Sequence, residues 1–142
     1  MRVQLAWYLE GRIIYTVGTD NAPVIGERNA HILEMLENEA KPPMVHIIID
    51  HTQQYSPEQL TKQPKSVGHY VKIHDDHVRE KLYNYPQLGW VISVATPNVA
   101  MKMAGTVAAQ KNSYRWHSVE TLGDALKFLQ VRDQSLPLLE VK

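Results

Sequence analysis

The stretch from Gly89 to Leu129 constrains the fold more than any other part of the chain. It begins with an apolar, β-branched run, residues 90–94, which has the length of a buried strand. Thr96-Pro97 follows, and a hydroxyl N-cap with proline at the first helical position predicts a helix start. Apolar residues then recur at helical spacing: Ala100, Met103, Ala104, Val107 and Ala108. We therefore expect a strand and an amphipathic helix, with Met103 packed in the core.

A second strand and helix complete this stretch. Lys111-Asn112 ends the first helix, and residues 114–116 predict a short strand. Ser118 is the predicted N-cap of the next helix, where Glu120 would lie near the positive end of the helix dipole. The apolar residues of this helix share one face: Leu122, Ala125, Leu126 and Leu129. Strands that alternate with helices in this way predict an α/β domain.

The N-terminal half predicts a hairpin, a helix and a central strand. Large apolar residues at positions 3, 5, 7 and 9 alternate with Gln4, Ala6 and Tyr8, Glu10-Gly11-Arg12 forms a turn, and residues 13–17 form the second strand. An amphipathic helix follows and ends near residues 41–43; its apolar positions are Ile25, Ile32, Leu33 and Leu36. Residues 44–49 are nearly all apolar apart from His46, as in a central strand covered on both faces. We expect His46 to be buried, with Asp50 at the strand end.

The region between Asp50 and Gly89 carries weaker signals. Ser56-Pro57-Glu58 predicts a short turn of helix, and residues 69–83 predict a charged helix that Pro86 ends. We see no linker or repeat that divides the chain. We therefore expect a single domain over residues 1–131, followed by a C-terminal extension over residues 132–142.

Composition excludes several functional classes. Lys plus Arg number 15 and Asp plus Glu number 15, so no global field would attract nucleic acid or an anionic membrane. The chain contains no cysteine, which excludes a disulfide, a thiolate nucleophile and a cysteine-bound metal. The N-terminus does not read as a signal peptide, and no apolar run has the roughly 18 residues of a membrane span. We expect a cytoplasmic protein.

The order β-β-α-β-α-β-α-β-α, a mixed sheet flanked by helices, resembles the STAS fold of SpoIIAA-like anti-sigma-factor antagonists and their Sec14-like relatives. The segments that carry this resemblance are MVHIIID, GWVISVATPNVAMKMAGTVAAQ and RWHSVETLGDALKFL. In such antagonists an Asp-Ser dipeptide followed by small residues presents the serine to a kinase. Here Ser56 has the corresponding location, but Tyr55 replaces the acid and Pro57 the small residue. The resemblance implies a regulatory domain without an intact phosphoswitch motif.

Asp50 and Thr52, at the end of the central strand, and Ser56, at the start of the short helix that follows, have both a structural and a functional interpretation. Ser56 reads first as a helix N-cap, although a phosphate there would also be favoured by the helix dipole. Asp50 and Thr52 lie where open α/β sheets bind ligands, yet turn capping is the simpler role for both.

The histidines do not establish an enzyme or a metal site. His74 and His77 are spaced i and i+3 with two carboxylates between them, a spacing that would allow a shared metal. A solvated charged helix explains the same pattern, so we assign no metal. We find no nucleophile elbow and no phosphate-binding glycine loop, and no Ser/His/Asp set follows from spacing. We therefore expect a non-enzymatic protein that needs no cofactor.

Two functional hypotheses follow. The first is a regulatory or protein-interaction domain, with its surface around the Asp50 to Ser56 loop and the neighbouring helices. The second is a module for a small apolar ligand or a lipid, with a pocket between residues 55–85 and the helix over residues 98–110. The residues that we expect to contact a partner or ligand are Asp50, Thr52, Tyr55, Ser56 and Met101.

The C-terminal extension predicts self-association. Its apolar residues are Leu136, Leu138, Leu139 and Val141. Apolar side chains of this kind are expected to pack against an apolar surface, either of the same subunit or of a second copy. A two-fold interface would also protect the edges of a mixed sheet. We expect a homodimer.

Overall fold

The computed structural model confirms an α/β architecture with a five-stranded mixed sheet. It describes residues 5–19, 22–52, 77–96, 99–112 and 115–141. The elements follow the predicted order β-β-α-β-α-β-α-β-α: β1 (Leu5–Leu9), β2 (Ile13–Val17), α1 (Ala22–Glu39), β3 (Val45–Asp50), α4 (His77–Tyr83), β4 (Leu88–Val94), α5 (Val99–Asn112), β5 (Arg115–Val119) and α6 (Leu122–Arg132).

The strands lie in the sheet in the same order as in the sequence, β1-β2-β3-β4-β5. β1 and β2 form the predicted antiparallel hairpin, and every later neighbour pair is parallel. The hairpin turn contains Gly11 at φ +74°, a left-handed conformation that glycine adopts without steric cost. The four strands β2 to β5 therefore have their carboxyl ends at one edge of the sheet.

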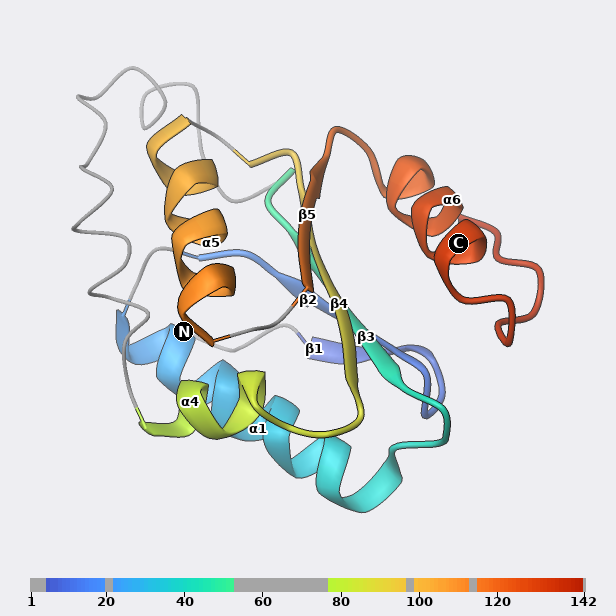
Figure 1. Ribbon diagram of the computed structural model, residues 1–142, viewed down its shortest axis with the longest axis horizontal. Coiled ribbons are helices and arrows are strands. Elements are labelled where there is room, and N and C mark those ends of the chain that lie inside the picture. The colour runs from blue at the N-terminus through green and yellow to red at the C-terminus, as the bar shows by residue number, and fades with distance from the viewer. Residues whose placement is uncertain (1–4, 20–21, 53–76, 97–98, 113–114, 142) are drawn as a thin grey trace.

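The helices form a layer on each face of the sheet. Figure 1 shows α1, α4 and α5 together on one face and α6 alone on the other. The connections β2 to β3, β3 to β4 and β4 to β5 all step in the same direction across the sheet. Because crossovers between parallel strands keep one hand, connections that step in one direction place their helices on the same face.

Each face of the sheet has its own apolar core. Neighbouring strand residues such as Ile13 and Ile14, or Ile47 and Ile48, point into opposite cores, as predicted for strands covered on both sides. The core under α1 and α4 contains Ile14, Ile32, Leu36, Val45, Ile47, Ile49, Leu82, Tyr83 and Val91. The core under α6 contains Ile13, Ile48, Ile92, Val94, Ala125, Leu126, Leu129 and Leu136.

Residues after α6 pack back on the same chain. Leu136 is buried in the core under α6, and Leu139 packs against that core. The Gln130 side chain fixes this path, since its amide donates to the Leu136 and Pro137 carbonyls at 3.3 and 3.0 Å and its oxygen accepts from the Leu139 N–H at 2.8 Å. Leu138 and Val141 are exposed. The predicted extension thus supplies part of the core.

Two local predictions are wrong. Ser118 does not cap α6, because it lies in β5 and pairs with Ser93 of β4. The cap is Thr121, whose hydroxyl accepts from the Asp124 N–H at 3.1 Å. Met103 does not pack in the core either: α5 directs Ala104 inward and leaves Met103 exposed. The small side chains of α5 bring this helix close to the sheet, as the packing of Gly105 on Trp116 shows.

Candidate functional site

The carboxyl edge of the sheet holds the predicted site residues that the structure describes. Asp50 ends β3 and is nearly buried, with its Oδ2 atom accepting a hydrogen bond from the Tyr15 hydroxyl at 2.5 Å. Its Oδ1 atom accepts from the Thr52 N–H at 2.9 Å. Asp50 and Thr52 are therefore joined as predicted, through a side-chain turn of the kind that caps strand ends. Tyr15, from the neighbouring strand, was not predicted.

The electrostatics of this pair oppose proton transfer near neutral pH. Burial raises the pKa of Asp50, but hydrogen bonds from Tyr15 and Thr52 outweigh it and hold the pKa below its ordinary value. Burial, followed by the hydrogen bond and the negative charge of Asp50, raises the pKa of Tyr15 to about 12. A general acid or base works best when its pKa lies near the operating pH. Asp50 and Tyr15 therefore act as a fixed acceptor and a fixed donor.

Hydroxyl groups continue this edge across β4 and β5. The Thr96 hydroxyl lies 2.5 Å from that of Ser93 and 3.2 Å from that of Ser118. Ala95, which lies between Ser93 and Thr96 in the sequence, has φ +54°, an uncommon conformation for a residue with a Cβ. Its N–H donates to the Val119 carbonyl, which holds the turn against β5. These bonds set where the chain leaves the sheet toward α5.

α5 carries a stripe of exposed apolar side chains that begins at this edge. We name Val99, Met103 and Val107 the α5 stripe; their exposed fractions are 71%, 52% and 41%. Residues four apart lie along one ridge of a helix. Lys102, the residue before Met103 on α5, pairs with Glu120, with 3.9 Å between Nζ and Oε1. The stripe is thus an apolar surface with a charged margin.

The remaining predicted site residues are described only in part. Tyr55 and Ser56 lie outside the described residues, as does His74. Met101 belongs to α5 and His77 begins α4, but their side chains lie outside the described part of the structure. Within the described ranges, no group of three His, Asp or Glu residues could hold a metal ion.

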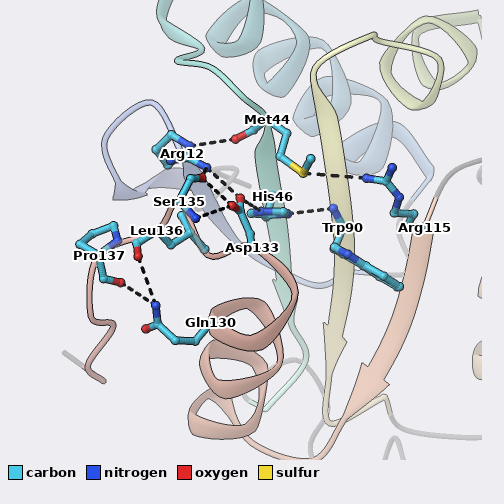
Figure 2. A network of polar contacts seen from close by, with 10 residues as sticks. All are labelled: Arg12, Met44, His46, Trp90, Arg115, Gln130, Asp133, Ser135, Leu136 and Pro137. Carbon is cyan, nitrogen blue, oxygen red and sulfur yellow. Dashed lines mark hydrogen bonds and ion pairs between the residues drawn. The ribbon is translucent and has the colours of Figure 1, made fainter.

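At the opposite end of the strands, a polar cluster of three buried residues and one exposed serine joins the sheet to the residues after α6. We define this cluster as Arg12, His46, Asp133 and Ser135 (Figure 2). Asp133 Oδ2 lies 2.8 Å from both Arg12 Nη2 and His46 Nε2. The Ser135 hydroxyl donates to Asp133 Oδ1 at 2.5 Å and accepts from Arg12 at 2.8 Å. Arg12 Nε donates to the Met44 carbonyl at 2.9 Å, which anchors the cluster before β3.

The hydrogen bonds of His46 fix its tautomer. Nδ1 accepts from the Trp90 N–H at 2.9 Å, so the ring proton lies on Nε2 and is donated to Asp133. Burial lowers the pKa of His46, and the attraction of Asp133 only partly opposes it. Burial raises the pKa of Asp133, but bonds from Ser135 and His46 outweigh it and lower the pKa. His46 is therefore a neutral imidazole, and it lies beside the Asp133 carboxylate, which is paired with Arg12.

This cluster lacks the geometry of a catalytic triad. Ser135 bonds to Asp133 and not to His46, and both ring nitrogens of His46 are occupied. A triad instead needs the serine on one imidazole nitrogen and the carboxylate on the other. The hydrogen bonds of the cluster join the hairpin turn, β3 and the residues after α6, and in this way they stabilise the fold. The sequence did predict a buried His46, but its partners are far away in the sequence and gave no local signal.

No described helix is both long and apolar enough to cross a membrane. Comparison of the chain with protein-family models, with curated proteins and with solved structures finds no match. The similarity to SpoIIAA-like proteins therefore rests on the element order and on the quoted segments.

Proposed function

We propose that this protein is a non-enzymatic regulatory or protein-interaction domain of the SpoIIAA-like type. In this proposal it binds an apolar helix ridge of a partner protein along the α5 stripe. The observation that carries the proposal is the exposure of Val99, Met103 and Val107 along one helix ridge. Exposed apolar patches with a polar margin are typical of protein-binding surfaces.

The spacing of the stripe supports a helical partner. Its members repeat every four residues and span about 12 Å of helix, or roughly two turns. A ridge of this kind packs into the grooves of a second helix. Lys102 and Glu120 at its margin would orient the partner by charge, since rim charges contribute more to specificity than to affinity.

The described polar groups support a binding role over a catalytic one. The pKa of Asp50 is lowered and that of Tyr15 is raised to about 12, which leaves neither poised to exchange a proton near neutral pH. His46 has both nitrogens engaged within the fold.

Whether Ser56 is phosphorylated is a prediction separate from the binding surface. With Tyr55 and Pro57 beside it, we expect Ser56 to serve as a helix cap. Ser56→Ala should then cost about 0.5–2 kcal/mol of stability without loss of any modification. Stoichiometric phosphate on Ser56, in protein from the cells that naturally make it, would contradict this.

Site-specific photo-crosslinking, in the cells that naturally make the protein, tests whether the α5 stripe binds a partner. A photoreactive phenylalanine analogue placed at Val99 or Val107 should give an adduct with one identifiable protein, and Met103→Glu should abolish it. The same analogue at Val131 is the matched control, because Val131 is about as exposed as Val99 but lies on α6, across the sheet. Equal adducts from all three positions would contradict the proposal. An adduct solely with a second copy of this chain would also contradict it and would make the stripe a self-association surface.

A further inference from the structure

The strand β5 forms one edge of the sheet. Within the described ranges it pairs with β4 alone (Figure 1). The Val119 carbonyl accepts from the Ala95 N–H, so the main chain of Val119 is directed toward β4. Because main-chain groups alternate in direction along a strand, the N–H and C=O groups of Trp116 and Ser118 are directed away from β4. These groups are placed to pair with an added strand.

The two faces of β5 differ in chemistry. The Trp116 indole points to the α5 face, where it packs at Gly105, and a Cβ added to this glycine would lie 2.5 Å from the ring. Arg115 and His117 alternate with Trp116 and therefore lie on the α6 face. Both are exposed, whereas Trp116 is half-buried. A strand that ran beside β5 would meet an indole on one face and basic side chains on the other.

α6 adds a second guanidinium to the basic face. His117 stacks on the Phe128 ring, with 4.2 Å between ring centroids and 12° between the planes. The guanidinium of Arg132 lies over the same ring, 4.5 Å from its centroid, and its side chain is exposed. Arg115 donates to the Met44 sulfur at 3.8 Å, an acceptor that is weak and carries no charge. The α6 side of this edge therefore attracts negative charge.

We propose that the β5 edge binds an extended segment of a partner protein in which acidic and apolar residues alternate. The segment adds to the sheet as a further strand, with its main chain paired to Trp116 and Ser118. Its acidic side chains lie near Arg115 and Arg132, and its apolar side chains lie near Trp116. Charge complementarity favours this occupant over a second copy, because two β5 strands side by side would bring like charges together. This site does not depend on the partner proposed for the α5 stripe.

Peptide binding to the full chain tests this edge. The probe is a peptide of four Glu-Val repeats. One control peptide has lysine in place of glutamate, and the other has the same composition in two blocks, the glutamates before the valines. Fluorescence anisotropy of the labelled peptides gives the dissociation constants, and amide hydrogen exchange followed by NMR locates the bound peptide.

Two variants separate a local effect from one of net charge. Arg115→Glu reverses a charge on β5. Lys127→Glu is the matched control, because it makes the same change in charge at an exposed position of α6. Arg115→Glu should weaken binding of the alternating acidic peptide about tenfold and strengthen binding of the lysine peptide, because an opposite-charge pair becomes a like-charge pair. Lys127→Glu should leave both dissociation constants nearly unchanged.

We expect the alternating acidic peptide to bind more tightly than both control peptides. It should slow amide exchange at Trp116 and Ser118 and leave the amide of His117, which is directed toward β4, unchanged. The proposal is overturned if the block peptide binds as tightly, if exchange at these two amides does not slow, or if the two variants weaken binding equally. Slower exchange at higher protein concentration without peptide would assign the edge to a second copy and would also overturn it.

Discussion

His46 and Asp133 are 87 positions apart in the sequence, yet their side chains share a buried hydrogen bond of 2.8 Å between Nε2 and Oδ2. This bond connects the central strand β3 to the residue that follows α6. Asp133 also neutralises Arg12 from the hairpin turn. One carboxylate therefore holds three distant parts of the chain together, and its loss leaves the buried Arg12 guanidinium without the carboxylate that neutralises it.

Asp133→Ala should destabilise the fold by about 3–5 kcal/mol, because breaking a buried ion pair leaves an uncompensated charge. Urea denaturation at neutral pH measures this change. Asp124→Ala is the control, because Asp124 is exposed in the first turn of α6 and should cost only about 0.3–1 kcal/mol through the helix dipole. Similar losses for the two variants would contradict the role given to the polar cluster.

Acid should weaken the fold in two steps. Burial lowers the pKa of His46 from 6.5, so below pH 6.5 the unfolded chain binds this proton more readily than the folded chain. The contribution of His46 is therefore complete above pH 6.5 and is lost as the pH falls toward its lowered folded-state pKa. Asp50 and Asp133, whose pKa values lie below 3.8 in the folded state, add a second loss below that pH.

The first step can be isolated by comparing slopes. The unfolding free energy of the wild-type chain should fall between about pH 7 and pH 5, and His46→Gln should flatten this part of the curve whatever its absolute stability. His31→Gln is the control for the loss of an imidazole, because His31 is exposed on α1. An identical slope for the wild-type chain and His46→Gln would exclude His46 as the source.

Two helical glycines should respond to alanine with opposite signs. Alanine normally stabilises a helix by about 0.5–1 kcal/mol relative to glycine. At Gly123 the added Cβ would meet its nearest neighbours at 3.7 and 3.8 Å, an ordinary contact, so Gly123→Ala should show this gain. At Gly105 the Cβ would lie 2.5 Å from the Trp116 ring, so Gly105→Ala should destabilise the chain. A stabilised Gly105→Ala would show that Trp116 is free to move.

The element order could be predicted from the sequence because it rests on local signals. The alternation of β1, the apolar run of β3 and the single apolar face of α6 are all visible within short windows. The cap of α6 was misplaced because Ser118 and Thr121 both carry a hydroxyl that can cap a helix, and serine is the slightly more common cap. Pairing with Ser93 across the sheet decides between them. Met103 was misplaced because the spacing of apolar residues predicts a helix but does not show which side of that helix packs on the sheet.

Some site residues could likewise be predicted from local sequence signals, and others depend on contacts between distant parts of the chain. Asp50 could be predicted because it follows a buried strand directly. Tyr15 could not, since its contact with Asp50 depends on the register between two strands. Arg12 and Asp133 belong to a turn and to a helix end, and only the tertiary fold brings them to His46. A buried histidine within an apolar strand was the available signal, because such a group needs polar partners.

Self-association through the residues after α6 remains a prediction, and the structure sharpens its test. Leu136 and Leu139 pack on their own chain, whereas 82% of Leu138 and 60% of Val141 is exposed. Truncation at Asp133 would also remove Leu136 from the core, so Leu138→Glu with Val141→Glu is the better variant.

We expect light scattering to give a homodimer for the wild-type chain and a monomer for this variant, because the added charges cannot be buried in a two-fold interface without partners. Val107→Glu, on α5, is the control and should remain dimeric. A wild-type chain that is monomeric throughout the micromolar range would contradict self-association, and a double variant that stays dimeric would move the interface away from this segment.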